Sequence, residues 1–141
     1  MKVSVGPILG FMIGALEKLA NAAPSSFHVL EPAKAKRLGG ATMVIPSPQD
    51  VANAVALIPP GETRTILDLR RQLAADAGAE IACPAATIKH WKWVAWASQE
   101  PLAPADIQAC PWWRILKDGK LSPHLPGGLD HHRQLLDLEL N

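Results

Sequence analysis

Tryptophans and basic residues gather in one short stretch of this chain, a combination that could bind nucleic acid. The five tryptophans are Trp91, Trp93, Trp96, Trp112 and Trp113. Lys89, Lys92 and Arg114 lie beside them in the sequence. Exposed aromatic rings can stack on bases while cations contact phosphates. Trp91 and Trp113 are expected to pack in the core. Adjacent residues of one element cannot all face that core, so other rings remain for binding.

Nucleophilic or metal chemistry has less support in the sequence. Cys83 and Cys110 are too few for a disulfide framework or an all-cysteine zinc site. Both precede a proline, at the edge of an expected element. His131 and His132 are adjacent and point apart on a helix, and no His-x-x-x-His or Cys-x-x-Cys motif accompanies them. A cysteine- or metal-dependent enzyme stays open as an alternative, and no cofactor is expected.

Length and net charge limit the classes of protein to which this chain can belong. The 141 residues suit one domain with a single modest core. Lysine and arginine number 14 and aspartate and glutamate 13, for a net charge of +1, which excludes a histone-like polycation and an acidic disordered tail. The hydrophobic fraction of 48% favours a folded globule. The near-zero charge leaves a protein partner open beside nucleic acid.

The first 40 residues are expected to form an N-terminal helix and a flexible arm, with the compact domain at residues 41–141. The apolar run that begins the chain could pass for a leader peptide. Gly10 interrupts that run, Glu17 and Lys18 place charges where cleavage would occur, and the run is too short to cross a bilayer, which takes about 20 residues. We therefore expect a cytoplasmic protein without membrane contact.

The compact part reads as short helices followed by one small hairpin. Ser47 predicts a helix start, residues 66–77 form a second helix that Gly78 ends, and residues 84–98 form a third. The last two have helix-turn-helix proportions. Asp118-Gly119 predicts a hairpin over residues 115–121. A last helix follows residue 128, with inward positions expected at Leu129, His132, Leu135, Leu136 and Leu140. The expected fold class is mainly α with a small β-hairpin, a winged helix-turn-helix.

One segment resembles a known family. Cys110-Pro111-Trp112-Trp113-Arg114-Ile115-Leu116, then Asp118-Gly119, Gly127-Gly128 and Leu135-Leu136, is similar to the DNA-binding domain of O6-alkylguanine-DNA alkyltransferases. That family has Pro-Cys-His-Arg-Val, a hairpin with glycine, Gly-Gly and a helix ending in Leu-Leu. Upstream, Ile58-Pro59, Gly61, Thr65 and Leu69 match its Ile-Pro-x-Gly and Ser/Thr-Tyr-x-x-Leu stretch. The resemblance covers about residues 43–139.

The departures from the family pattern indicate a lost activity. The alkyl-acceptor cysteine falls on Trp112 and its activating histidine on Trp113, and thiolate chemistry needs both groups. The family tyrosine falls on Ile66, and the finger arginine has no clear match. A tryptophan at the acceptor position is typical of alkyltransferase-like proteins. These bind O6-alkylated guanine, rotate it out of the duplex without repair, and mark the site for nucleotide excision repair.

The resemblance implies a non-catalytic DNA-binding monomer whose partners are double-stranded DNA, alkylated or not, and a nucleotide excision repair protein. The implied DNA contacts are Thr65, Lys89, His90, Lys92, Arg114, Lys117 and Lys120. The implied base pocket consists of Pro111, Trp112, Trp113, Gly127 and Gly128. The alternative is a winged-helix module that binds a protein through its tryptophans, without lesion recognition.

Overall fold

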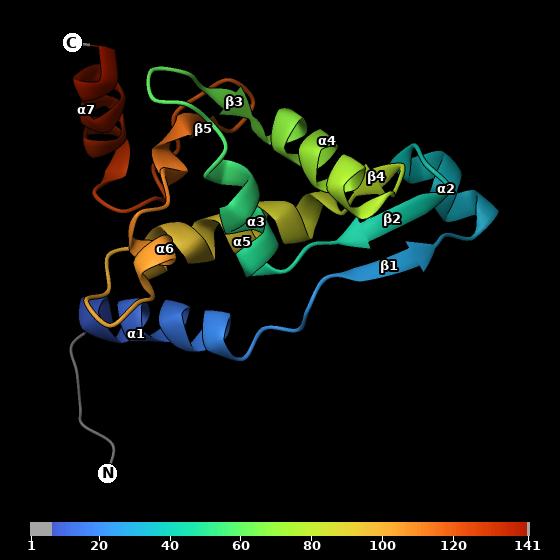
Figure 1. Cartoon of the computed structure of the whole chain (residues 1–141), viewed down its shortest axis with the longest axis horizontal. Coiled ribbons are helices and arrows are strands. Elements are labelled where there is room, and N and C mark those ends of the chain that lie inside the picture. The colour runs from blue at the N-terminus through green and yellow to red at the C-terminus, as the bar shows by residue number, and fades with distance from the viewer. Residues whose placement is uncertain (1–6, 141) are drawn as a thin grey trace.

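Seven α-helices and five short strands make up the part of the chain that the structure, a computed structural model, describes: residues 7–140 (Figure 1). The helices are α1 Pro7–Ala20, α2 Pro32–Leu38, α3 Pro48–Val55, α4 Ile66–Ala77, α5 Pro84–Ala97, α6 Ala105–Gln108 and α7 Gly128–Leu140. The strands are β1 Ser26–Val29, β2 Thr42–Ile45, β3 Arg64–Thr65, β4 Ile81–Ala82 and β5 Ile115–Leu116, with a 3-10 turn, η1, at Trp112–Arg114. The chain is therefore a mixed α/β structure in which about half of the residues are helical.

Local sequence signals explain where the central helices begin and end. The Ser47 hydroxyl accepts the backbone N–H of Asp50 at 3.1 Å and caps α3, as expected. Thr65 and Asp68 form a reciprocal capping box at the start of α4. Gly78 ends α4 with φ +68°, in the left-handed region that disfavours other residues. Both predicted boundaries of α4 are confirmed.

The core forms around α5. Helices α1, α3 and α4 all pack on it, and Figure 1 shows α1 running along one side of α5 and α3 crossing it. Trp91 and Ala95 on α5 are 0% exposed, which confirms the prediction that Trp91 belongs to the core. Among the α5 side chains, Ala85 and Lys89 are the exposed ones. Most of the surface of α5 is thus used for packing.

The segment expected to be a flexible arm contains a strand and a helix instead. β1 pairs antiparallel with β2, which pairs parallel with β4, so this sheet crosses the expected boundary at residue 40. Ser25 fastens the segment further: its hydroxyl accepts the N–H of Ser47 at 2.7 Å and donates to Asp50. Phe27 and Val29 on β1 remain 53% and 79% exposed. The strand sequence Ser26-Phe27-His28-Val29 does alternate polar and apolar residues, but over only four positions this is a weak strand signal, and the prediction did not use it.

The N-terminal expectations are only partly open to comparison. Residues 7–20 do form a helix, α1, and its Ala15 is buried against the core. Residues 1–6, on which the leader-peptide alternative partly rests, lie outside the described residues. Within the described part, no helix combines the length and apolar character needed to cross a membrane.

The C-terminal part differs in detail from the expected helices and hairpin. The turn is present: Lys117 and Lys120 form a bridge, and Asp118 and Gly119 between them have φ of 53° and 73°. However, β5 pairs with β3 in parallel rather than with a long returning strand. The short helix α6 lies between the predicted helix over residues 84–98 and the predicted hairpin, where no element was expected.

The last helix, α7, buries a narrower face than its leucines suggested. His132 is fully buried, as expected. Leu129 and Leu140 are 43% and 72% exposed, so the expectation that they point inward is wrong. The reason is that α7 packs mainly on η1, a single turn that covers only one side of the helix.

Candidate nucleic-acid interface

Trp112, the residue expected to line a base pocket, lies in the core. Its side chain is 1% exposed. Its ring centroid is 5.7 Å from that of Trp113, edge to face, and 5.7 Å from that of His132. The indole N–H of Trp91 donates to the backbone carbonyl oxygen of Trp112 at 3.0 Å. A base could therefore reach this ring only after the residues that cover it had moved.

Trp113 and Arg114 are held by the carboxylate of Glu139. Arg114 Nε donates to Glu139 Oε1 and Oε2 at 2.9 and 3.1 Å, and Trp113 Nε1 donates to Oε1 at 2.5 Å. The N–H of Gly61 donates to Oε2 at 2.8 Å. Arg114 also donates to the carbonyl of Ile58 at 2.7 Å. We call the group of Gly61, Trp113, Arg114 and Glu139 the Glu139 clasp.

The clasp removes Arg114 from the predicted DNA contacts in this conformation. The Arg114 and Glu139 side chains are only 13% and 12% exposed. Burial alone would raise the pKa of Glu139, but the hydrogen bonds from Gly61, Trp113 and Arg114, with the Arg114 charge, bring that pKa below its ordinary value. The clasp therefore ties the end of α7 to the loop before β3, which is a structural role.

Two further predicted DNA contacts serve the fold. The Thr65 hydroxyl accepts the N–H of Asp68 at 3.1 Å and is committed to the α4 cap. His90 Nδ1 lies 2.7 Å from the carbonyl oxygen of Pro46. Burial lowers the pKa of His90, which the Pro46 carbonyl opposes and the Lys89 charge assists. A neutral, internally bonded imidazole is a poor partner for phosphate.

The remaining residues of the implied base pocket shape a turn. Gly127 and Gly128 have φ of 79° and 75° and lead the chain into α7. A Cβ at Gly127 would come within 2.5 Å of the Cβ of His131, so only glycine fits there. Pro111 is buried. Gly127 is exposed and Gly128 half-buried, and both serve to turn the chain between η1 and α7.

Lysines and tryptophans do come together at another place, between α1 and α5. They surround a hollow of about 220 Å³. The residues lining it are Ala15, Lys18, Lys89, Lys92, Trp93, Trp96 and His124. The ammonium groups of Lys18 and Lys89 lie 5.4 and 5.2 Å from the centroid of the Trp93 ring. Trp96 Nε1 donates to the carbonyl of His124 at 3.0 Å. We call this set the lysine–tryptophan patch.

The patch is a local concentration of positive charge in a nearly neutral chain. Three lysines line the hollow and no carboxylate is among its lining residues. Lys18 and Lys89 are exposed, while Lys92, Trp93 and Trp96 are half-buried. The patch can therefore offer cations to phosphates and ring surface to an unstacked base.

Of the predicted DNA contacts, the structure brings Lys89 and Lys92 together at this patch. Lys117 and Lys120 are exposed, but they follow β5, which lies across α5 from α1 in Figure 1. Sequence reasoning missed Lys18 and His124. Both are far from residues 89–96 along the chain and reach the patch only through tertiary packing, so no local pattern could have identified them.

The two free cysteines differ in burial, and no metal-binding cluster is found among the described residues. Cys110 is 1% exposed, and burial, assisted by the Asp106 charge, raises the pKa of its thiol to about 12. Cys83 is half-buried at the start of α5. Within residues 7–140, no group of three or more histidine, cysteine, aspartate and glutamate side chains is arranged to hold a metal ion.

Comparisons with known proteins add no further constraint. No family model, curated protein or solved structure matches this chain. The chemistry of the patch itself is therefore the basis for assigning a function.

Proposed function

We propose that this protein is a non-catalytic DNA-binding protein of the alkyltransferase-like type and that the lysine–tryptophan patch is its contact surface. One observation carries the proposal: Lys18, Lys89 and Lys92 converge with two tryptophan rings on one hollow that no carboxylate lines. Phosphate contacts supply most of the affinity of such proteins for DNA. Stacking of a base on tryptophan is tolerant of sequence and suits an unpaired or extruded base.

The expected free energies favour a base stacked on Trp93 over the present contacts of Lys18 and Lys89 with that ring. A cation over an exposed ring contributes roughly 0.5–1 kcal/mol. Stacking of a base on an aromatic side chain contributes roughly 1–3 kcal/mol. Lys18 and Lys89 are exposed, so they can leave the ring and contact the phosphates on either side of the stacked base. DNA binding would therefore replace the weak lysine–Trp93 contacts with a stronger base–Trp93 stack and stronger lysine–phosphate contacts.

A winged helix-turn-helix is part of the proposal. Helices α4 and α5, joined through residues 78–83, would be the helix-turn-helix, and the Asp118-Gly119 turn would be the wing. Because α1, α3 and α4 pack on α5, α5 would contact DNA through the side that bears Lys89 and Lys92. The exposed wing lysines, Lys117 and Lys120, would add a separate phosphate contact.

The absence of alkyl transfer is also proposed. The alkyl-acceptor position of the family that this chain resembles falls on Trp112, whose indole is not a nucleophile. The nearby Cys110 is buried, and the pKa of its thiol is raised. Recognition of O6-alkylguanine and recruitment of a repair protein would be further steps. With Trp112 buried in this conformation, a preference for the lesion would require η1 or α7 to move away from that ring.

Fluorescence anisotropy with labelled oligonucleotides tests the proposal. The ligands are a single strand, a duplex, and the same duplex with one O6-methylguanine. If three lysines each neutralise one phosphate, the log–log slope for the duplex is about −2.7, and affinity falls roughly fortyfold between about 50 and 200 mM salt. Trp93→Ala should weaken single-strand binding by about 1–3 kcal/mol.

A matched control lies on α2, which Figure 1 places at the far side of the sheet from α1. Lys34→Gln with Lys36→Gln removes two exposed lysines there and should leave the salt slope unchanged. Lys89→Gln with Lys92→Gln should reduce the slope by about 1.8. Absence of duplex binding at about 50 mM salt would sink the proposal. Self-association in sedimentation without any response to DNA would select the protein-interaction alternative.

A further inference from the structure

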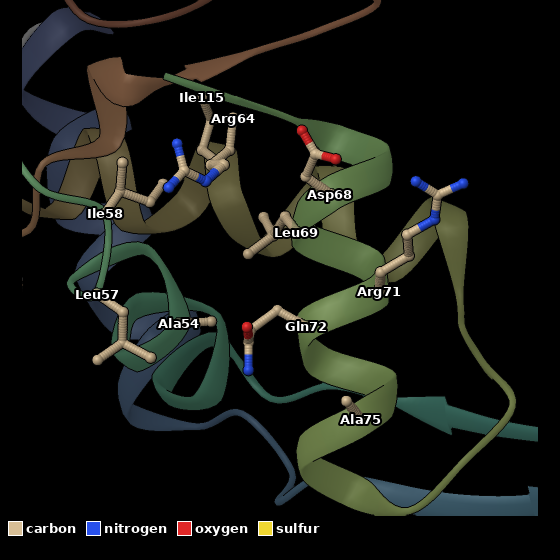
Figure 2. Close-up of a pocket in the computed structure, with 10 residues that line it drawn as sticks. All are labelled: Ala54, Leu57, Ile58, Arg64, Asp68, Leu69, Arg71, Gln72, Ala75 and Ile115. Atoms are coloured by element: carbon tan, nitrogen blue, oxygen red, sulfur yellow. The ribbon is translucent and has the colours of Figure 1, made fainter. Parts of the chain in front are cut away.

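A cleft of about 420 Å³ opens between α3 and α4, separate from the lysine–tryptophan patch (Figure 2). The two hollows share no lining residue. The floor of the cleft is apolar, with Ile58, Leu69 and Ile115 all buried at 7% exposure or less. Leu57 stands at the rim and is 69% exposed. The volume falls in the range of about 300–1,000 Å³ that is usual for small-molecule sites.

Two polar groups face this apolar floor. In Figure 2 the guanidinium of Arg64 extends toward Ile58, and the amide of Gln72 points toward Ala54 on the opposite wall. The guanidinium of Arg71 points away from the cleft, although Arg71 belongs to its lining. The cleft therefore combines one inward cation and one amide with an apolar interior.

The single carboxylate of the lining is already used. Asp68 accepts the backbone N–H of Thr65 at 2.9 Å, and this bond, together with a hydrogen bond to the Thr65 side chain, lowers the pKa of Asp68. In Figure 2 its carboxylate sits at the top of α4. It partly offsets the charge of Arg64. The Gln72 amide nitrogen donates to Asp76 at 2.8 Å, so the Arg64 guanidinium is the group that a ligand can engage in this cleft.

The present partners of Arg64 are easily replaced. Its Nη2 lies 3.1 Å from a Glu62 carboxylate oxygen, in an ion pair whose side chains are 40% and 51% exposed. Its Nη1 donates to the Thr63 carbonyl at 3.0 Å. Exposed ion pairs contribute only about 0–1 kcal/mol. A carboxylate seated over the apolar floor could accept both guanidinium N–H groups in a fork geometry, which is the stronger arrangement.

We propose that the cleft between α3 and α4 binds a small ligand with an apolar body and one carboxylate. The carboxylate would accept from the Arg64 guanidinium. The apolar body would cover Ile58, Leu69 and Ile115 and contact the exposed Leu57. A phosphodiester backbone does not fit this site, because its repeated charges would extend beyond Arg64 onto the apolar floor. The cleft is thus a second binding site, independent of the proposed DNA contacts.

An NMR titration of the full-length, 15N-labelled protein tests the assignment. Octanoate is the probe, and octylammonium, with the same chain and the opposite charge, is its control. N-acetyl-leucine is a second probe that carries a peptide-like carboxylate. If it binds more tightly than octanoate, the natural ligand is a peptide carboxyl terminus. We expect amide shifts concentrated at Ala54, Leu57, Leu69 and Gln72. Octanoate should bind about tenfold or more tightly than octylammonium.

Two variants and a matched control separate a site from nonspecific adsorption. Arg64→Gln should weaken octanoate binding at least about fivefold, while Arg71→Gln should change it less than about twofold. Leu57→Asp places a negative charge at the exposed rim, should keep the fold, and should also weaken octanoate binding.

Three results would overturn the assignment. They are no saturable shifts up to about 20 mM octanoate, equal binding of octylammonium, and equal losses in Arg64→Gln and Arg71→Gln. None of them bears on DNA binding at the patch.

Discussion

The Glu139 clasp and the lysine–tryptophan patch contain the same kinds of side chain and use them in opposite ways. At the clasp, a carboxylate accepts from Trp113, Arg114 and a backbone N–H, so donors and charge are satisfied internally. At the patch, three lysines surround tryptophan rings and no carboxylate lines the hollow. Trp96 at the patch also has a backbone acceptor, the His124 carbonyl, so the difference lies in the cations: a carboxylate holds Arg114 at the clasp, and none lines the hollow beside the lysines.

The largest expected effect tests whether the clasp region is structural. Trp112 is 1% exposed beside the clasp, so Trp112→Ala should lower the free energy of unfolding by about 3–5 kcal/mol. Urea denaturation measures this loss. Trp112→Phe fills more of the volume and should cost less. Binding of lesion-bearing and plain duplex should fall together, and only through the unfolded fraction.

The opposite result for Trp112→Ala is a stability loss under about 1 kcal/mol together with a selective loss of affinity for O6-methylguanine duplex of about 1–3 kcal/mol. It would mean that the region of the clasp also binds DNA, as the patch is proposed to do. Trp112 would then line a base pocket in solution, and the comparison between clasp and patch would fail.

A second test removes the acceptor of the clasp. Glu139→Gln keeps the size of the side chain but leaves Arg114 without its ion pair, and should cost roughly 2–3 kcal/mol at pH 7. Because the pKa of folded Glu139 lies below its ordinary 4.5, its contribution is complete above that value and is lost as pH falls through the folded pKa. The stability gap between wild type and Glu139→Gln should therefore shrink as pH is lowered from 7 toward 3.

The control for this test is Glu62→Gln, which breaks an exposed ion pair with Arg64. It should change stability by less than about 1 kcal/mol at any pH. A gap for Glu139→Gln that stays constant down to pH 3 would show that the carboxylate charge contributes nothing, and that the clasp holds by packing alone.

Much of the helical framework could be predicted from local sequence. Ser47 and Gly78 act on their own helix ends, so short-range chemistry was enough for the start of α3 and the end of α4. Thr65, which caps α4, was predicted only as a DNA contact. β1 was missed because its alternation of polar and apolar residues spans only Ser26–Val29, and Phe27 and Val29 are exposed, so burial adds no further signal. The parallel pairing of β3 with β5 joins residues 64–65 to 115–116, and local propensity holds no information about such distant partners.

The site was predicted less completely, for a reason the comparison makes plain. Lys89 and Lys92 were singled out beside tryptophans, and they do lie at the patch. Arg114 was singled out by the same logic, yet its partner Glu139 comes from the other end of the C-terminal region. Sequence shows which side chains could bind. Their use depends on acceptors that only the tertiary fold brings near.

The smallest expected effect concerns Lys18, the patch residue that sequence reasoning missed. Lys18→Gln should reduce the log–log salt slope for duplex binding by about 0.9 and weaken affinity roughly fivefold near 50 mM salt. Lys18→Arg keeps the charge and should keep the slope. Anisotropy titrations over a salt series measure both quantities, with Lys34→Gln on α2 as the control.

The shape of those salt curves distinguishes a phosphate contact from a contact made only to Trp93. Lys18 lies over the Trp93 ring in the free protein, so its removal also uncovers ring surface and favours stacking. That gain does not depend strongly on salt, whereas the lost phosphate contact does. The curves for wild type and Lys18→Gln should therefore converge as salt rises. Parallel curves, or a variant that binds more tightly at every salt concentration, would mean that Lys18 only shields Trp93, and the patch would then contact phosphates through Lys89 and Lys92.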